Sequence, residues 1–376
     1  PPVVQEMAEV LLVSKPVSPP WNDSSKNLVR ELAVNMTRHV PIVMSKRGAL
    51  PELAGARIEA VYAPGSGRFA PALADNARVM LRLLAGRRAP LWHLFFAPNP
   101  LSSAMAELAA GAKKARTVQT ICSIPAPDAD LRSLLFADVS VAVSCRTERL
   151  LLEAGLRPDR VRRIPPAVSR VQPLGRERRE QVRRLFDLPV DGPLLVYPGD
   201  LEVGRGADRA LQVLADLPGD LDAHLAIACR AKTPEAREHE ARLKNQARQL
   251  RLTSRVSWVG ETTAVLELLA AADLVLFPVD DLTAKMDLPL VLIEAMSART
   301  AVLLTTGTSA EELAEGGAGL AVVPERDAIS QAVRGLLQDE TERLGLADRG
   351  YRAVEERYRP QAMAAAYEQV YDELLG

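Results

Sequence analysis

In the stretch KMDLPLVLIEAMSARTAVLLTT, from Lys285 to Thr306, Asp287 and Pro289 lead into an apolar run that one carboxylate, Glu294, interrupts. Pro289 suits the first turn of a helix, because its missing N–H would have no partner there. The pattern therefore predicts a helix that begins near Leu288, just past a strand, with backbone amides able to bind a phosphate. Glu294 follows about 7 Å further along the helix axis, where it could accept hydrogen bonds from a ribose. The alternative is an ordinary carboxylate on the wet edge of a buried helix.

Short β-branched strands alternate with helical patterns on both sides of this segment. The strand-like runs include EVLLVSK, VPIVMS, RTVQTI and DVSVAVS in the first half, and PLLVYPG, AHLAIA, RVSWVG, DLVLFPV, AVLLTT and GLAVV in the second. This rhythm predicts βαβ units and parallel sheets. It breaks at Ile164, where prolines and a charge run indicate a linker that carries one basic helix. The fold class is therefore α/β, with two doubly wound, Rossmann-like domains facing a cleft and ligands at the carboxyl ends of the strands.

Three motifs resemble one family. The run LPLVLIEAMSARTAVLLTTGTSAEELAEGGAGLAVVPERDA (288–328) resembles the C-terminal signature of the retaining GT-B glycosyltransferases, the glycogen-synthase-like or group 1 family (glycosyltransferase family 4-like). LLVYPGDLEVGRGADRALQVLADL (Leu194–Leu217) resembles the first strand–loop–helix of that family's nucleotide domain. VSCRTERLLLEAGLRPDRVRRIPPAV (Val143–Val168) resembles the last strand–helix–strand of its acceptor domain.

This resemblance implies that the two halves of the chain bind different substrates. Residues 1–168 would bind the acceptor, 169–192 would be a linker, 193–357 would bind the nucleotide sugar, and 358–376 would be a C-terminal helix. The last helices would cross back to the first domain. The family uses a nucleotide-diphosphate sugar, here a UDP- or GDP-sugar, retains the anomeric configuration and needs neither a cofactor nor a bound metal. The departing phosphate usually takes the acceptor's proton.

The resemblance also implies a donor-binding set in the second half. Its members are Gly199, Asp200, Asp287, Leu288, Pro289, Leu290, Glu294 and Glu312. Glu294 would bind the ribose, and the backbone at Leu288–Leu290 would bind the phosphates. Glu312 falls near the donor by family position, or is an exposed acid at a helix start.

The cations of the family pattern are incomplete in this chain. Family members carry Gly-Arg and then Lys-Gly, whereas this chain has Asp200 after the first glycine and Arg205 before the second. Arg205 is a good bidentate phosphate ligand. Lys285 could supply the missing charge, or is a solvated lysine. Met286 stands where a glutamate often contacts the donor sugar.

The first half also departs from the family. Asn22, Asp23 and Ser24 replace a glycine-rich loop and would border the donor phosphate and the acceptor, or simply cap a helix. In WHLFFAPNPLSSAM, His93 fits the first histidine of a His-x-His strand, but Phe95 takes the second. The candidate catalytic residues are therefore Arg205 and Lys285, with His93 either catalytic or structural.

The amino-acid composition narrows the classes of function and partner that remain. The first 170 residues carry 23 Lys and Arg against 14 Asp and Glu, and the rest carry 24 against 34. This asymmetry is either ordinary solvated surface or a basic half that meets an anionic membrane surface or a phosphorylated acceptor. Nucleic acid is not expected, because aromatics are 4% and do not interleave with a basic run. The three scattered cysteines predict no disulfide or zinc site. No spanning segment or signal peptide is evident, so we expect a cytoplasmic protein, either free or peripheral to the inner face of the membrane.

Two other functions stay open from the residues. Asp200, Met286 and Phe95 also suit a catalytically degenerate GT-B protein that acts as a nucleotide-binding or scaffolding partner. A nicotinamide-dependent dehydrogenase is disfavoured, because no GxGxxG follows the first strand. The VDD run at Val279–Asp281 imitates a metal-binding motif, but no metal is expected in this architecture. The acceptor stays undetermined among a glycan, a lipid-linked glycan and a small molecule.

Overall fold

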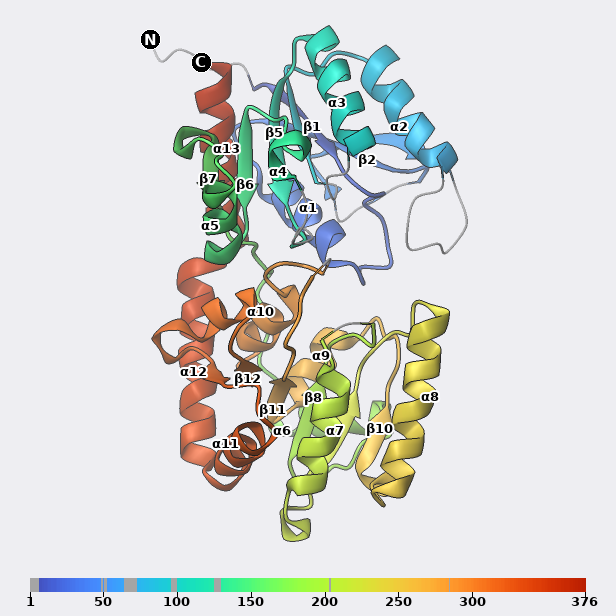
Figure 1. Ribbon diagram of the computed structural model, residues 1–376, viewed down its shortest axis with the longest axis vertical. Coiled ribbons are helices and arrows are strands. Elements are labelled where there is room, and N and C mark those ends of the chain that lie inside the picture. The colour runs from blue at the N-terminus through green and yellow to red at the C-terminus, as the bar shows by residue number, and fades with distance from the viewer. Residues whose placement is uncertain are drawn as a thin grey trace. The chain divides into compact units, whose positions relative to one another are not determined.

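A computed structural model describes residues 7–376, apart from 49, 51–52, 64–72, 96–99, 125–129, 203 and 284. The chain divides into two compact units, each built on its own sheet (Figure 1). Unit 1 contains Pro1–Ala167, Thr283–Leu288 and Arg359–Gly376, and unit 2 contains Val168–Leu282 and Pro289–Tyr358. All the strands in both sheets run parallel. The predicted α/β class with two Rossmann-like domains is therefore confirmed.

Unit 1 has a seven-stranded sheet in the order β3-β2-β1-β4-β5-β6-β7. Its strands are β1 (Glu9–Val13), β2 (Val40–Lys46), β3 (Arg57–Tyr62), β4 (Leu91–Leu94), β5 (Arg116–Ile121), β6 (Val139–Ala142) and β7 (Val161–Arg163). Its helices are α1 (Ser24–Asn35), α2 (Leu73–Ala85), α3 (Pro100–Lys113), α4 (Leu131–Leu134), α5 (Cys145–Glu153) and α13 (Pro360–Leu375).

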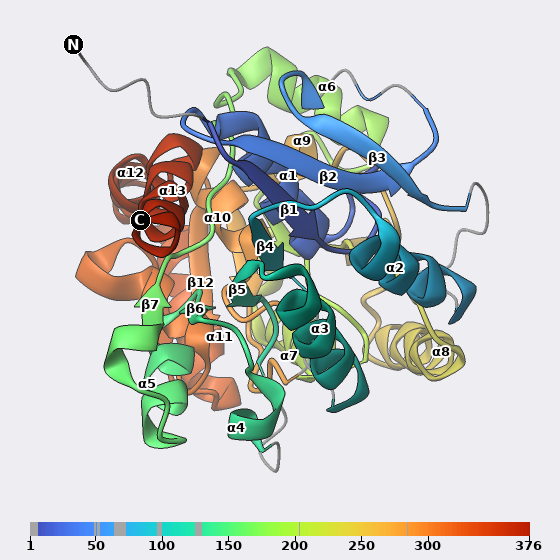
Figure 2. The ribbon, with the colours of Figure 1, turned by 90° about the horizontal axis from the view of Figure 1, so that it is seen from above.

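The side chains of β1 show why this sheet is covered on both faces. Val10 and Leu12 are wholly buried in a cluster with residues of α1 and α13. Leu11 and Val13 point the other way, into a cluster with residues of α2 and α3. Alternation with a period of two sends successive side chains to opposite faces. Helices α2 and α3 lie side by side over the second face (Figure 2).

Unit 2 has a six-stranded sheet in the order β10-β9-β8-β11-β12-β13. Its strands are β8 (Leu194–Tyr197), β9 (His224–Ile227), β10 (Val256–Trp258), β11 (Leu274–Phe277), β12 (Ala301–Thr305) and β13 (Leu320–Val322). Its helices are α6 (Arg176–Leu185), α7 (Gly206–Asp216), α8 (Pro234–Gln249), α9 (Val265–Ala271), α10 (Leu290–Ser297), α11 (Arg326–Gln338) and α12 (Glu340–Arg357).

Two boundaries differ from the sequence-based expectation. The predicted linker 169–192 belongs to unit 2, because α6 packs on α9 and Arg183 is buried against Asp273. Residues 283–288, expected in the donor domain, belong to unit 1. There the amide of Asp287 donates to the carbonyl of Cys122 at 2.8 Å. Both contacts join residues far apart in sequence, which local patterns do not report.

Candidate functional site

Helix α10 contains Glu294, the carboxylate that interrupts the apolar run. It begins at Leu290 with Pro289 as its N-cap, within two residues of the predicted start. Val291 and Glu294 are its half-buried residues, and their spacing of three puts them on one side of the helix. Among the described residues no side chain caps this N-terminus and no acid lies in its first turn. The start of α10 is therefore suited to an anion, with Glu294 one turn further along.

Two glycines of the second motif lie next to Tyr197: Gly199 in the loop between β8 and α7, and Gly206 at the start of α7. Tyr197 fills the space beside this loop, and its hydroxyl donates to the carbonyl of Asp200 at 3.0 Å. A Cβ on Gly199 would lie 2.2 Å from the Tyr197 ring, and one on Gly206 would lie 2.5 Å from its hydroxyl. Only glycine fits at either position, so the tyrosine fixes the course of the backbone toward α7.

Arg205 immediately precedes α7 and presents a largely exposed cation. Its side chain is 73% exposed, and its guanidinium donates to Asp280 at 2.8 Å. The less exposed Arg209, one turn into α7, donates to the same carboxylate oxygen at 2.7 Å. Burial alone would raise the pKa of Asp280, but the two arginines outweigh it and hold the pKa below its usual value. Asp280 therefore stays ionised at neutral pH as the counter-ion of both cations.

The VDD run thus has a role other than the metal motif it imitates. Asp280 is engaged by arginines, and no group of three His, Cys, Asp or Glu in the described part of the chain could hold a metal ion. Sequence reasoning missed Arg209 altogether. Arg209 follows Arg205 by four residues at the start of a helix. This spacing was the signal that both side chains would lie on one side of α7.

The other donor-site candidates of unit 2 follow neighbouring strands. Asp200 accepts a hydrogen bond from the amide of Glu202 at 2.9 Å, which closes a turn in the β8–α7 loop. Glu312 is half-buried in the 3₁₀ segment Ser309–Gly317, which follows β12. Because β8, β11 and β12 are adjacent, these loops share the carboxyl edge of the sheet, where its strand order reverses.

Two of the donor-binding candidates and the catalytic candidate Lys285 fall in unit 1 instead. Asp287 is wholly buried and accepts from the hydroxyl of Ser144, the N-cap of α5, at 2.7 Å, so its carboxylate ties this segment to the start of α5. Leu288 is also wholly buried. Lys285 is half-buried, and its carbonyl accepts from the amide of Ile124 at 3.3 Å. The expected donor contact of Asp287 is corrected to a structural one.

His93 is corrected in the same way. It is wholly buried, with its Nδ1 2.6 Å from the Tyr371 hydroxyl and its Nε2 2.7 Å from Thr120 Oγ1. Burial lowers the pKa of His93 well below its usual value, so the ring is neutral. Both nitrogens are used in fastening α13 to β4 and β5, which leaves none for a substrate.

The loop before α1 shows a capped helix where the family has glycines. Asp23 accepts from the amides of Ser25 and Lys26, and it pairs with Lys15 at 3.2 Å. Burial favours a higher pKa for Asp23, but Lys15 and these hydrogen bonds together hold the pKa below its usual value. Asn22 and Ser24 are half-buried beside it. Asp23 therefore acts as the helix cap, and its proximity to a substrate stays a prediction.

The chain is similar to known proteins in sequence and in fold. Residues 178–353 match the family described as Glycosyl transferases group 1. Unit 2 is a group 1 glycosyltransferase domain. The N-acetyl-alpha-D-glucosaminyl L-malate synthase of Bacillus anthracis is 25% identical over 197 residues, which are 52% of this chain and 49% of that protein. The chain thus matches about half the length of this curated relative.

Solved structures extend the likeness to both units of the chain. Anabaena HepE, solved in complex with UDP-glucose, has a TM-score of 0.78 at 17% identity and covers 98% of this chain and 100% of its own. The sucrose-phosphate synthase of Thermosynechococcus elongatus has a TM-score of 0.77 at 18% identity, and the match covers 98% of this chain and 99% of that protein. A glycosyltransferase of Rickettsia africae has a TM-score of 0.77 at 17% identity, and the match covers 98% of this chain and 99% of that protein. At these identities the likeness shows the fold, which is that of the GT-B proteins.

Proposed function

We propose that this protein is a retaining hexosyltransferase that moves a sugar from a UDP- or GDP-sugar to an acceptor without a bound metal. The start of α10, with Glu294 one turn on, is the observation that carries the proposal. A nucleotide diphosphate needs an anion site and a group that accepts from ribose hydroxyls a short distance away. Helix amides supply the first and Glu294 the second.

Charge on the leaving diphosphate decides what the remaining residues do. As the sugar–phosphate bond breaks, negative charge grows on the phosphate, and fixed donors and cations stabilise it. The exposed guanidinium of Arg205 fits this role, since it can reach a phosphate with two N–H groups. It would leave Asp280 to Arg209, which already donates to the same oxygen. The proton of the acceptor hydroxyl would pass to the departing phosphate.

The acceptor is proposed to bind unit 1. The group 1 domain of unit 2 and the solved complex of HepE with UDP-glucose both support the assignment of the donor to unit 2. Unit 1 contains the basic excess of the chain, with exposed cations at Arg87, Arg88, Lys114 and Arg116. These support a peripheral contact with an anionic membrane surface on the cytoplasmic side. No helix in the described ranges is long and apolar enough to span a bilayer.

A degenerate nucleotide-binding protein is the second candidate, and one observation favours it. Arg205 is the single cation retained at its motif, and its guanidinium already donates to Asp280. Asp200 stands at the other cationic position. Such a protein would bind a donor without turnover, so donor hydrolysis or sugar transfer separates the two functions.

Nucleotide diphosphates should stabilise the protein in the presence of EDTA. A ligand that binds only the folded state raises stability by about 2.7 kcal/mol at a hundredfold excess over its Kd. The measurement is a thermal-shift series with UDP, GDP, ADP and their sugars. UMP serves as the control, because it lacks the second phosphate that α10 and Arg205 would hold. If no diphosphate raises the melting temperature, the proposed function is wrong.

Replacing Glu294 by alanine should weaken donor binding by about 1.5–3 kcal/mol, since hydrogen bonds to a charged acceptor are lost. The fold should persist, because the side chain is only half-buried. Calorimetric titration with the stabilising nucleotide sugar measures the loss. Glu340→Ala, at an exposed position of α12, is the matched control and should bind as the wild type does. Unchanged affinity in Glu294→Ala would make Glu294 the ordinary carboxylate of the alternative reading.

A further inference from the structure

We infer that unit 1 binds the apolar part of an amphiphilic acceptor in a pocket at the carboxyl edge of its sheet, an inference that rests on the proposed transfer reaction. The pocket has a volume of about 400 Å³ and is lined by the ends of β1, β3, β4 and β5 together with α2 and α3. This volume is within the range of small-molecule sites. The chain leaves β1 toward β2 and later returns to β4 on its other side, so the pocket lies where the strand order reverses.

The walls of the pocket are mainly hydrophobic. Helix α2 contributes Val79, Met80 and Leu83, and α3 contributes Leu101 and Met105. Methionine side chains are flexible and polarizable, so they adapt to apolar ligands of varied shape. A bare sugar would leave hydroxyl groups without partners against such walls, at a free-energy cost. The occupant is therefore an apolar chain or ring system.

The residue at the base of the pocket, Phe95, is apolar like the residues of its walls. Phe95, which stands where the family often has a histidine, is 3% exposed and lines the pocket. Its ring lies 3.9 Å from that of His93, whose own nitrogens are used elsewhere. The departure from His-x-His thus replaces a polar group by an aromatic surface at this place.

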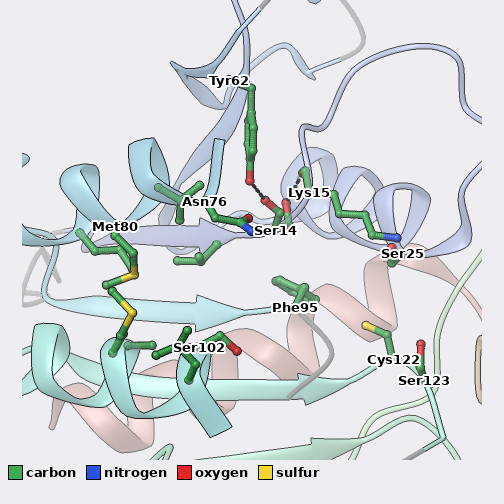
Figure 3. A pocket seen from close by; sticks show the side chains of 16 residues that line it. Ser14, Lys15, Ser25, Tyr62, Asn76, Met80, Phe95, Ser102, Cys122 and Ser123 are labelled. Atoms are coloured by element: carbon green, nitrogen blue, oxygen red, sulfur yellow. Dashed lines mark hydrogen bonds between the residues drawn. The ribbon is translucent and has the colours of Figure 1, made fainter. Parts of the chain in front are cut away.

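Lys15, the charged residue among those that line the pocket, lies at one end of it. Figure 3 shows Lys15, Ser25, Cys122 and Ser123 at one end and Met80 at the other, with Phe95 between them. Burial raises the pKa of the Cys122 thiol to about 12, so it is a neutral group at this end and not a thiolate. Asn76 and Ser102 are the polar lining residues toward the Met80 end (Figure 3). The cation and hydroxyl groups at the opposite end match an amphiphile whose hydroxyl head lies near Lys15 and Ser25.

The apolar lining continues onto the open surface of α3. Leu101 is 71% exposed and Met105 37%, although both line the pocket. A chain too long for the pocket would leave across these two residues. Leu108, two turns beyond Leu101, is 74% exposed and does not line the pocket. It offers a matched control of the same residue type, exposure and helix.

The test is binding of glucose, hexyl glucoside and octyl glucoside to the full chain, below micelle-forming concentrations and without a donor. Each added methylene should tighten binding about fourfold, since a buried CH₂ is worth about 0.8 kcal/mol and 1.4 kcal/mol is tenfold. Leu101→Gln and Met105→Gln should weaken octyl glucoside binding about fivefold or more. Leu108→Gln should leave it unchanged.

Two results would overturn the inference. Glucose binding as tightly as octyl glucoside would exclude an apolar site. An equal loss in Leu108→Gln and Met105→Gln would show adsorption over the whole α3 surface, as at a lipid bilayer, rather than entry into the pocket. Glutamine is a good helix former, so the variants should stay folded, and their nucleotide-induced thermal shifts check this. Chain-length-dependent binding without any nucleotide-induced shift would contradict the proposed transfer reaction while leaving the amphiphile site in place.

Discussion

Replacing Arg205 by alanine should lower the rate of sugar transfer about a hundredfold or more, with a smaller loss of donor affinity. The unequal effect follows from the reaction, because charge on the diphosphate is greater in the transition state than in the bound donor. The guanidinium is available for this role, being 73% exposed at the start of α7. Arg205→Lys should recover only part of the rate, since an ammonium cannot form the bidentate contact.

Single-turnover transfer, or donor hydrolysis in the absence of acceptor, measures this effect. Arg248→Ala, at an exposed position of α8, is the control and should keep the wild-type rate. Arg209→Ala and Lys285→Ala decide which residue supplies a second cation. If Lys285→Ala turns over normally while Arg205→Ala does not, the expected compensation by Lys285 is wrong. A wild-type rate in Arg205→Ala itself would contradict the proposed leaving-group role.

Replacing Asp273 by alanine should destabilise unit 2 by about 3–5 kcal/mol, the usual effect of removing one partner from a buried ion pair. Asp273 accepts from Arg179 at 2.8 Å, from Arg183 at 2.7 Å and from the amide of Leu194 at 2.8 Å. Arg183 is 5% exposed, so the alanine variant leaves a buried cation without its carboxylate. Glu342→Gln, in an exposed pair with Arg349, should change stability by about 0–1 kcal/mol.

The same carboxylate predicts a pH dependence. Burial alone would raise the pKa of Asp273, but the Leu194 amide and the two arginines outweigh it and lower the pKa. A lowered folded-state pKa gives stability that is present above the unfolded-state pKa, about 3.9, and is lost as pH falls through the folded-state value. Urea unfolding with hydrogen exchange in β8 and β11 measures the effect at neutral and acid pH. A stability difference between wild type and Asp273→Asn that does not shrink in acid would contradict this account.

Local patterns in the sequence predict the elements of the fold and select one candidate binding residue on α10. Strands with β-branched residues, the alternation of helices and strands, Pro289 before an apolar run, and Asp23 before α1 are all local signals. They act through backbone preferences and side-chain periodicity over a few residues, and sheet class follows from them. The single carboxylate of α10, Glu294, could be selected for the same reason, because one helix turn relates it to the helix start.

Which distant residues meet is visible only in the folded chain. His93 reads as a candidate catalyst until Tyr371, 278 positions away, is found on one of its ring nitrogens. Asp280 stands in a run that imitates a metal motif, and its role as a counter-ion is found only when Arg205 and Arg209 are placed on it. Asp287 reads as a donor contact until its segment is found in unit 1 against Ser144. The role of a polar side chain depends on what removes it from water and what pairs with it there, and packing between remote segments sets both.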